Sequence, residues 1–126
     1  MDALYTDDER LLAKTIRDFA EAELSPLAAR WDQNEEFPWE SLEGLKRMDL
    51  MGLTIATDQG GAGASYAEMV IVDEEIARVC MTTSTTHLTH ISLSASTIDR
   101  FGSPQQRARF LPAMASGEKL GAFGLT

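Results

Sequence analysis

Apolar residues recur at intervals of three and four positions along most of this chain, and that spacing predicts amphipathic helices. The first stripe runs from Leu12 to Leu27 and predicts a helix that ends at about Asp32. Pro26 interrupts this stripe, and we expect a packed kink rather than two helices, although proline inside an isolated helix costs about 3 kcal/mol. Further stripes predict helices at about 37–49, 65–79, 82–101 and 103–117.

The starts and ends of these helices are marked by specific side chains. Capping boxes, in which two side chains each bond the other's backbone N–H, are predicted at Thr6–Glu9, Ser65–Glu68 and Ser103–Gln106. The hydroxyl-rich run Thr82–Thr86 is a candidate cap for another helix. Gly102 is expected to end that helix in the left-handed conformation, which glycine adopts without a steric penalty.

Two stretches have a pattern typical of extended backbone. Met51–Ala56 is a short β-like run, and Gly121–Thr126 is an apolar run whose glycines suit a backbone lying close to something flat. The predicted fold class is therefore all-α, an up-down bundle of about five helices with a short C-terminal β-strand.

Composition and charge exclude several classes of protein. A chain of 126 residues with 44% hydrophobic content is one globular domain with its own core. The net charge of −9 argues against nucleic acid and against an anionic membrane surface as partners. A single cysteine, Cys80, excludes an internal disulfide framework and fits a reducing compartment. With no apolar span or leader visible, we expect a cytoplasmic protein. The acidic runs Asp7–Glu9 and Glu74–Glu75 are interpreted as solvated helix faces.

Two motifs suggest ligand chemistry that their context does not support. Gly61-Ala-Gly63 follows a β-like run and precedes a helix, but Tyr66 stands where a dinucleotide-binding loop has its third glycine. We interpret the loop as a turn that needs positive φ angles. His87 and His90 lie one helical turn apart, yet a metal site needs further ligands that this segment lacks, so hydrogen bonding within the bundle is the expected role.

The helix expected at 82–101 is rich in Ser, Thr and Ala, which are poor choices for an exposed helix. Two interpretations remain open. The hydroxyls bond back to their own helix and the small residues allow close packing, or Met81–Thr86 and the helix face after it border a cavity.

The last fifth of the chain resembles the flavin-dependent acyl-CoA dehydrogenases. The residues that carry this resemblance are Gly102-Ser103, Gln106-Arg107, Phe110-Leu-Pro-Ala-Met-Ala-Ser-Gly-Glu118 and Ala122-Phe-Gly-Leu-Thr126. Glu74-Glu75-Ile76-Ala77-Arg78 and the loop at 58–64 extend the resemblance, although Ala56 stands where the family usually has proline. In the family the final Thr is followed by E-P-x-A-G-S-D, and no residues follow Thr126 here.

The resemblance implies a helical N-terminal domain over residues 1–117 and the start of a missing middle β domain at 118–126. It implies an enzyme that oxidises acyl-CoA to trans-2-enoyl-CoA with FAD, that passes electrons to an electron-transfer flavoprotein, and that forms a dimer or tetramer. By the same resemblance Phe123, Leu125 and Thr126 contact the flavin ring. The catalytic carboxylate belongs to a C-terminal helical domain, so this chain is expected to hold no catalytic residue and to be inactive alone.

Two other functions remain as alternatives to a piece of such an enzyme or of a related oxidase or monooxygenase. The chain would be a stand-alone helical module that recruits a protein partner through its small-residue face, or a metal-binding bundle that uses His87 and His90.

Overall fold

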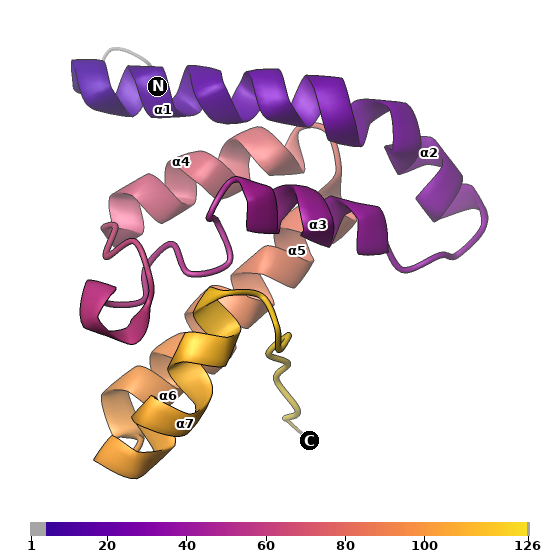
Figure 1. The fold of residues 1–126 in the computed structure, drawn as a ribbon. Helices are drawn as coiled ribbons and strands as arrows, with labels where there is room; N and C mark the ends of the chain where they lie inside the picture. Colours follow the sequence, from indigo (N-terminus) through magenta and orange to yellow (C-terminus); the bar gives the residue numbers. More distant parts are fainter. Residues whose placement is uncertain (1–4, 126) are drawn as a thin grey trace.

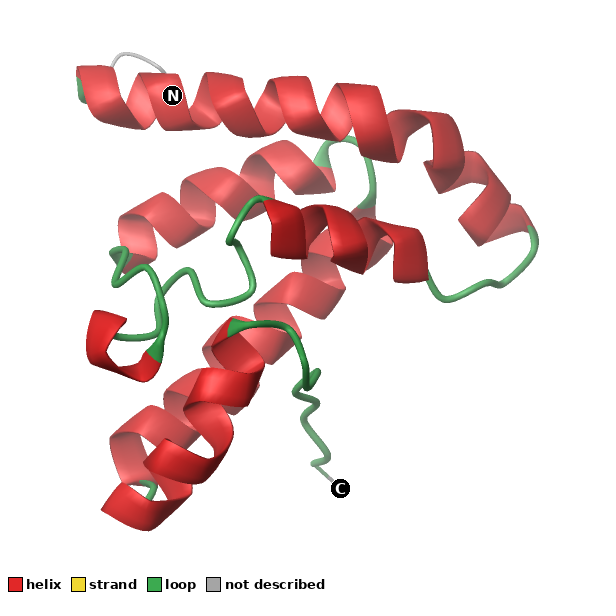
Figure 2. Ribbon diagram, viewed as in Figure 1, coloured by secondary structure: helices red, strands yellow, loops and turns green. Residues whose placement is uncertain are grey.

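The computed structural model describes residues 5–125, and helices account for all the regular secondary structure in that part of the chain (Figure 1, Figure 2). Helices α1, η2 and α2 run on as one rod, and so do α5, η4 and α6, which confirms the predicted all-α class. The elements are α1 (Asp7–Phe19), η2 (Ala20–Leu24), α2 (Ser25–Gln33), α3 (Trp39–Arg47), η3 (Thr57–Gln59), α4 (Tyr66–Ala77), α5 (Met81–Leu88), η4 (Thr89–Ala95), α6 (Ser96–Phe101) and α7 (Pro104–Ala115).

The rods pack in two connected groups. Helix α1 lies along α4, and α3 packs against η2 beneath the bend of the first rod (Figure 1). The second rod leaves α4 and descends away from α1, and α7 turns back along α6 and η4. The C-terminal segment then runs beside the upper part of that rod. No helix in the described residues is both long and apolar enough to cross a membrane.

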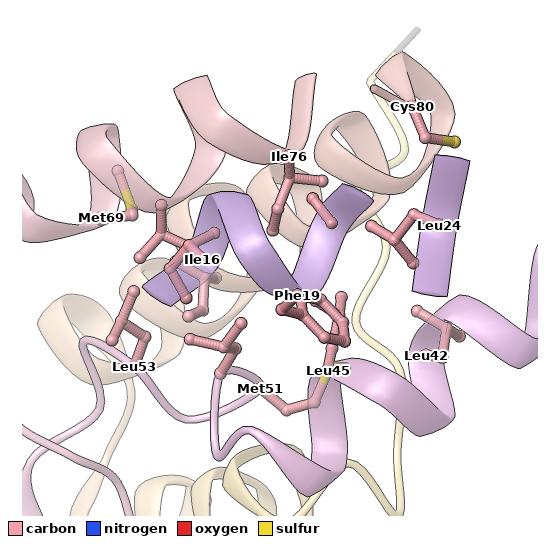
Figure 3. Close-up of a cluster of buried hydrophobic side chains, with 14 of the residues drawn as sticks. Ile16, Phe19, Leu24, Leu42, Leu45, Met51, Leu53, Met69, Ile76 and Cys80 are labelled. Carbon is pink, nitrogen blue, oxygen red and sulfur yellow. The ribbon is translucent and has the colours of Figure 1, made fainter. Parts of the chain in front are cut away.

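The main hydrophobic core lies between α1, η2, α3 and α4, and it is built from the predicted stripes. Ile16 and Phe19 face Leu45, Met51 and Ile76 in this cluster (Figure 3). A smaller core joins Ile55 and Ala95 to the apolar face of α7. Each buried side chain of this size stabilises the fold by about 1.5–3 kcal/mol. These two clusters therefore hold the helices in their relative positions.

Both long rods contain a π-helical segment, which the sequence analysis did not predict. In the first rod the N–H of Ser25 bonds to the carbonyl of Ala20, five residues back, immediately before Pro26. The wider turn lets the chain continue past a residue that lacks an N–H. The predicted kink without a break is therefore confirmed, and the bend is visible between α1 and α2 (Figure 1).

Helix starts were predicted better than helix ends. All three capping boxes, Thr6–Glu9, Ser65–Glu68 and Ser103–Gln106, are present with both of their hydrogen bonds. The predicted left-handed Gly102 is wrong, because its backbone is extended, with φ −71° and ψ 148°. Glycine is needed there for space, since a Cβ would lie 2.4 Å from the carbonyl oxygen of Ile98.

The two predicted extended runs do not form strands in the described residues. Met51–Ala56 folds as successive turns, with Leu53 N bonded to Leu50 O and Ile55 N to Gly52 O. From Gly121 to Leu125 the chain is irregular, because a strand needs a neighbouring strand and none is present among residues 5–125. Thr126 lies outside the described residues.

The interpretation of α4 as carrying its acids on a solvated face is also wrong in part. Asp73 and Glu75 are buried, whereas Glu74 is exposed. Each buried acid has a charged or polar partner in another helix, which is the usual condition for burying a carboxylate. Apolar spacing alone could not reveal these pairs.

Candidate functional site

An open cavity of about 390 Å³ lies between α5 and the C-terminal segment. One wall is the hydroxyl-rich face of the second rod, and the opposite wall is Leu120–Ala122. Phe37, from the turn before α3, closes one side. The prediction that the turn at Met81–Thr86 and the following helix face border a cavity is therefore confirmed. The lining residues are Phe37, Met81, Thr82, Thr85, Thr86, Thr89, Leu120, Gly121 and Ala122.

The other interpretation of this helix, that its hydroxyls bond back to their own helix, holds as well. The hydroxyl of Thr86 donates to the carbonyl of Thr82 at 2.8 Å, and the hydroxyl of Ser92 donates to the carbonyl of Leu88 at 2.7 Å. A hydroxyl that is satisfied within its own helix presents less polarity to the space beside it. Thr86 therefore contributes less polarity to the cavity wall than its side chain alone suggests.

The predicted cap at Thr82–Thr86 is wrong. Cys80 is the N-cap residue of α5, and its side chain makes no capping bond. Thr83 and Ser84 lie inside the helix and are buried, with their hydroxyls bonded to Cys80 Sγ and to the carbonyl of Asp73. The hydroxyl of Ser84 thus joins α5 to α4, and the hydroxyl of Thr83 bonds to the thiol of the N-cap residue, so neither bonds a free backbone N–H at the helix start.

His87 is fully buried and joins two other elements. Its Nδ1 lies 2.8 Å from Asp73 Oδ1 on α4, and its Nε2 lies 2.9 Å from the carbonyl oxygen of Leu50. Asp73 Oδ2 has no hydrogen-bond partner among the described residues.

His90 is also fully buried, and three separate segments meet at its ring. Its Nε2 lies 3.0 Å from Met51 O and 3.2 Å from Met114 O, and its Nδ1 accepts the N–H of Gly121 at 2.9 Å. Burial lowers the pKa of His90 below its ordinary value, against the opposing effect of the two carbonyls. The prediction that both histidines are hydrogen-bonded within the bundle is confirmed.

The metal-binding alternative gains no support from this arrangement. Both ring nitrogens of His87 and of His90 already face protein partners. Across residues 5–125, no three His, Cys, Asp or Glu side chains are grouped so that they could hold a metal ion.

Glu75 forms a two-bonded pair with the guanidinium of Arg17 on α1. The distances are 2.7 Å from Nη2 to Oε1 and 2.9 Å from Nε to Oε2. The hydrogen bonds from Arg17 hold the pKa of Glu75 below its ordinary value, and burial opposes them. This pair ties α1 to α4 and lies apart from the cavity lining.

The glycine loop is a turn, as predicted, and its backbone has no donors left for a phosphate. Gly60 and Gly63 have positive φ angles of 87° and 66°. Each N–H from Gly60 to Ala64 donates to a carbonyl of the preceding segment, Ala62 to Gly52 and Gly63 to Ile55 among them. A phosphate-binding loop needs such N–H groups to be free.

Two of the three predicted flavin-contacting residues, Phe123 and Leu125, follow closely after Ala122 in the cavity wall. Phe123 is 51% exposed and Leu125 is 82% exposed, so neither belongs to a core of this chain. Thr126 lies outside the described residues. The assignment of these three residues to a cofactor is not tested by this geometry and stays a prediction.

Sequence reasoning missed the other walls of the cavity. Phe37 and Leu120 lie far from α5 in the chain and are brought to it only by the fold. The hydrogen bond between His90 and Gly121 joins residues 31 positions apart, so it could not be predicted from local spacing either. The one available signal was the aromatic residue Phe37 beside a proline, which marks a turn but not its neighbours.

Comparison with known proteins gives one consistent family. Residues 6–118 match the family described as "Acyl-CoA dehydrogenase, N-terminal domain". The chain is 38% identical over 126 residues to a short-chain specific acyl-CoA dehydrogenase of Clostridium acetobutylicum. The aligned region covers 100% of this chain and 33% of that protein. The chain therefore spans about a third of the length of the curated relatives that it matches.

Solved structures agree with this comparison. A butyryl-CoA dehydrogenase structure from Megasphaera elsdenii matches with a TM-score of 0.88 at 30% identity, over 100% of this chain and 34% of that one. A chain in a structure described as the electron transferring flavoprotein of Acidaminococcus fermentans matches with a TM-score of 0.90 at 28% identity, over 100% of this chain and 33% of that one.

Proposed function

Because this chain belongs to the family of the acyl-CoA dehydrogenase N-terminal domain, we propose that it is the N-terminal part of a flavin-dependent acyl-CoA dehydrogenase. The complete enzyme would oxidise an acyl-CoA thioester to the trans-2-enoyl thioester. Residues 1–117 would form its helical domain and residues 118–126 would begin its middle β domain. One observation carries the proposal: the segment expected to contact flavin continues directly from the wall of the cavity.

The residues after Gly121 fit a flat aromatic cofactor. The side chains of Phe123 and Leu125 are exposed, and the backbone N–H groups of 122–125 have no partner within the described part of the chain. Exposed apolar side chains beside free N–H donors suit a ring with apolar faces and a polar edge. Phe123 and Leu125 would hold FAD by packing, and Thr126 by its hydroxyl. When bound, FAD would supply the two-electron oxidation.

The cavity itself would bind the acyl chain. Its walls combine Met81, Leu120 and Phe37 with threonines such as Thr86, whose hydroxyl is already bonded to its own helix. An acyl chain gains about 0.8 kcal/mol for each CH₂ that it buries in such a site. The role of this chain would be to bind and orient the substrate and to exclude water.

The remaining chemistry would belong to the rest of the enzyme. We propose that the carboxylate base is supplied outside this chain, that the complete protein is a homo-oligomer, and that it passes electrons to an electron-transfer flavoprotein. The match to a chain in the Acidaminococcus fermentans structure supports the last of these. The buried, free thiol of Cys80 is compatible with a reducing compartment, and we propose the cytoplasm.

The first test uses the complete protein and a series of straight-chain acyl-CoA substrates. Thr86→Leu fills part of the cavity and is expected to raise KM for longer chains by about tenfold, equal to about 1.4 kcal/mol. Thr97→Leu makes the same change on α6 of the same rod, away from this cavity, and should leave KM unchanged. Absence of acyl-CoA oxidation by the complete protein would contradict the proposal.

The second test concerns Thr126 in the complete enzyme. Thr126→Val keeps the shape of the side chain and removes its hydroxyl, leaving a flavin ring atom unpaired at a cost of about 1–3 kcal/mol. We expect FAD affinity to fall by about tenfold and the reduction potential to fall with it. Equal affinity and potential in wild type and variant would show that Thr126 does not contact the ring.

A further inference from the structure

The hydrogen bonds around His90 fix which of its nitrogens carries the proton. The carbonyl oxygens of Met51 and Met114 can only accept, so Nε2, at 3.0 and 3.2 Å from them, must donate. The N–H of Gly121 can only donate, so Nδ1, at 2.9 Å, must accept. His90 is therefore neutral with its proton on Nε2. A protonated ring would direct a second N–H at the N–H of Gly121.

Gly121 lies so close to η4 and α7 that any larger residue would force the side chains of Ser94 and Met114 to move. A Cβ at this position would lie 2.5 Å from Ser94 Oγ and 2.7 Å from Met114 Cε. The backbone at Gly121 is thus pressed onto η4 and α7, with the ring of His90 as its hydrogen-bond partner. The π-helical turns of η4 begin at Thr89, and such turns often occur at functional sites.

The bond from Gly121 to His90 is the last one that holds the C-terminal segment. The bond before it joins Lys119 N to Ala113 O at 2.9 Å. After Gly121, residues 122–125 make no hydrogen bond within the described part of the chain. Leu120, Gly121 and Ala122 also form one wall of the cavity. An interaction that holds Gly121 in place therefore also holds that wall in place, and it sets where the segment beginning at Phe123 leaves the helices.

We propose that His90 is a positioning residue, which holds Gly121 through its neutral, Nε2-protonated ring and thereby sets the position of the cavity wall and the departure of the segment beginning at Phe123. The identity of the ligands that this geometry serves, an acyl thioester and a flavin, rests on the proposed function. The hydrogen bonding does not depend on it.

The first experiment needs no ligand. In the ¹⁵N-labelled wild-type chain, long-range proton–nitrogen NMR correlations should show a neutral His90 with its proton on Nε2. A proton on Nδ1, or a charged ring at neutral pH, would overturn the proposal without any variant.

A pair of variants then separates the two nitrogens. Asn can place its oxygen near the position of Nδ1, whereas Gln reaches toward Nε2 and leaves Gly121 unpaired. Exchange of the Gly121 amide proton with solvent should be about tenfold faster in His90→Gln than in His90→Asn, as expected for the loss of about 1.4 kcal/mol. The Lys119 amide should be unchanged in both variants. Equal Gly121 exchange in wild type and His90→Gln would overturn the proposal.

In the complete enzyme, His90→Gln is expected to weaken FAD binding about tenfold, and His90→Asn should restore most of it. A purely structural role predicts that both variants lose stability without this rescue. If the complete enzyme does not oxidise acyl-CoA at all, the proposed function fails, while the tautomer and exchange results still decide the role of His90.

Discussion

His87 and His90 lie one turn apart on the same rod, yet their surroundings give them different chemistry. Among residues 5–125, the hydrogen-bond partners of His90 are all backbone groups, and these define a neutral ring. His87 instead faces a side chain, the carboxyl group of Asp73, at 2.8 Å. Two histidines in one rod thus have different roles, because the fold places different groups beside them.

The first prediction at this scale concerns Asp73. Asp73→Asn should change the free energy of unfolding by less than about 1 kcal/mol, because the amide can donate to His87 Nδ1 while Nε2 donates to Leu50. Asp73→Leu leaves that ring nitrogen unpaired in the core and should cost about 1–3 kcal/mol. Urea unfolding of the three proteins measures the difference. Equal stability of the Leu and Asn variants would show that the pair is not needed.

A second residue-scale prediction is a loss of stability as the pH falls below the ordinary histidine pKa of 6.5. Burial lowers the pKa of His90 in the folded state, so below 6.5 the unfolded chain binds a proton that the folded chain does not. The contribution is complete above pH 6.5 and is lost progressively below it, by at most about 1.4 kcal/mol per pH unit.

The matched control for this pH effect is His90→Asn, which cannot titrate. Its free energy of unfolding should fall less than that of wild type between pH 7.5 and pH 5.5. Glu40, Glu68 and Glu75 have lowered pKa values and lose their contributions only below about 4.5, outside this range. Parallel curves for wild type and His90→Asn would exclude His90 as the source.

At the scale of elements, the sequence predicted what depends on neighbours within one turn. Helix positions, capping boxes and buried stripes follow from local spacing, and the structure confirms them at Thr6, Ser65 and Ser103. The cavity beside α5 was predicted from the small residues on its face. What failed depends on distant partners: the conformation of Gly102, the turns at 51–56, and the burial of Asp73 and Glu75.

Pro26 provides an element-scale prediction. The π-helical segment before it already absorbs the missing N–H, so Pro26→Ala should leave helical content equal or slightly higher. The change in stability should be modest, about 1 kcal/mol or less, since the packed kink is held by buried neighbours such as Leu24. Circular dichroism and thermal unfolding check both values. A gain of several helical residues in the variant would show that the wild-type helix breaks at this point.

The glycine loop at 58–64 provides another element-scale prediction. A Cβ on Gly61 would lie 2.0 Å from the backbone carbonyl oxygen of Ile55, which cannot move without disturbing the turns beneath it. Gly61→Ala is expected to destabilise the fold by about 1–3 kcal/mol. Gly124→Ala is the matched control, because no neighbouring atom in the described part of the chain lies within 4 Å of its Cβ position. Urea midpoints that shift equally in both variants would contradict this assignment.

At the scale of the whole molecule, the cores and the proposed flavin contacts lie in different parts of the chain. The core residues Ile16, Leu45 and Ile76 are almost fully buried, which indicates that the helical part can fold on its own. Phe123 and Leu125 instead extend away from any core and remain largely exposed. The proposed flavin contacts thus begin where the packing of this chain ends.

The last prediction follows from that separation. The 126-residue polypeptide expressed alone should fold, with helical circular dichroism and cooperative unfolding, but should lose FAD on dialysis. Its exposed apolar segment offers few contacts, and binding must offset several kcal/mol of lost translational and rotational freedom. The complete protein with the same residues should keep its flavin absorption through the same dialysis. A yellow 126-residue chain would show that this helical part contains a sufficient flavin site by itself, and would move the proposed contacts from the 123–126 segment into the cavity.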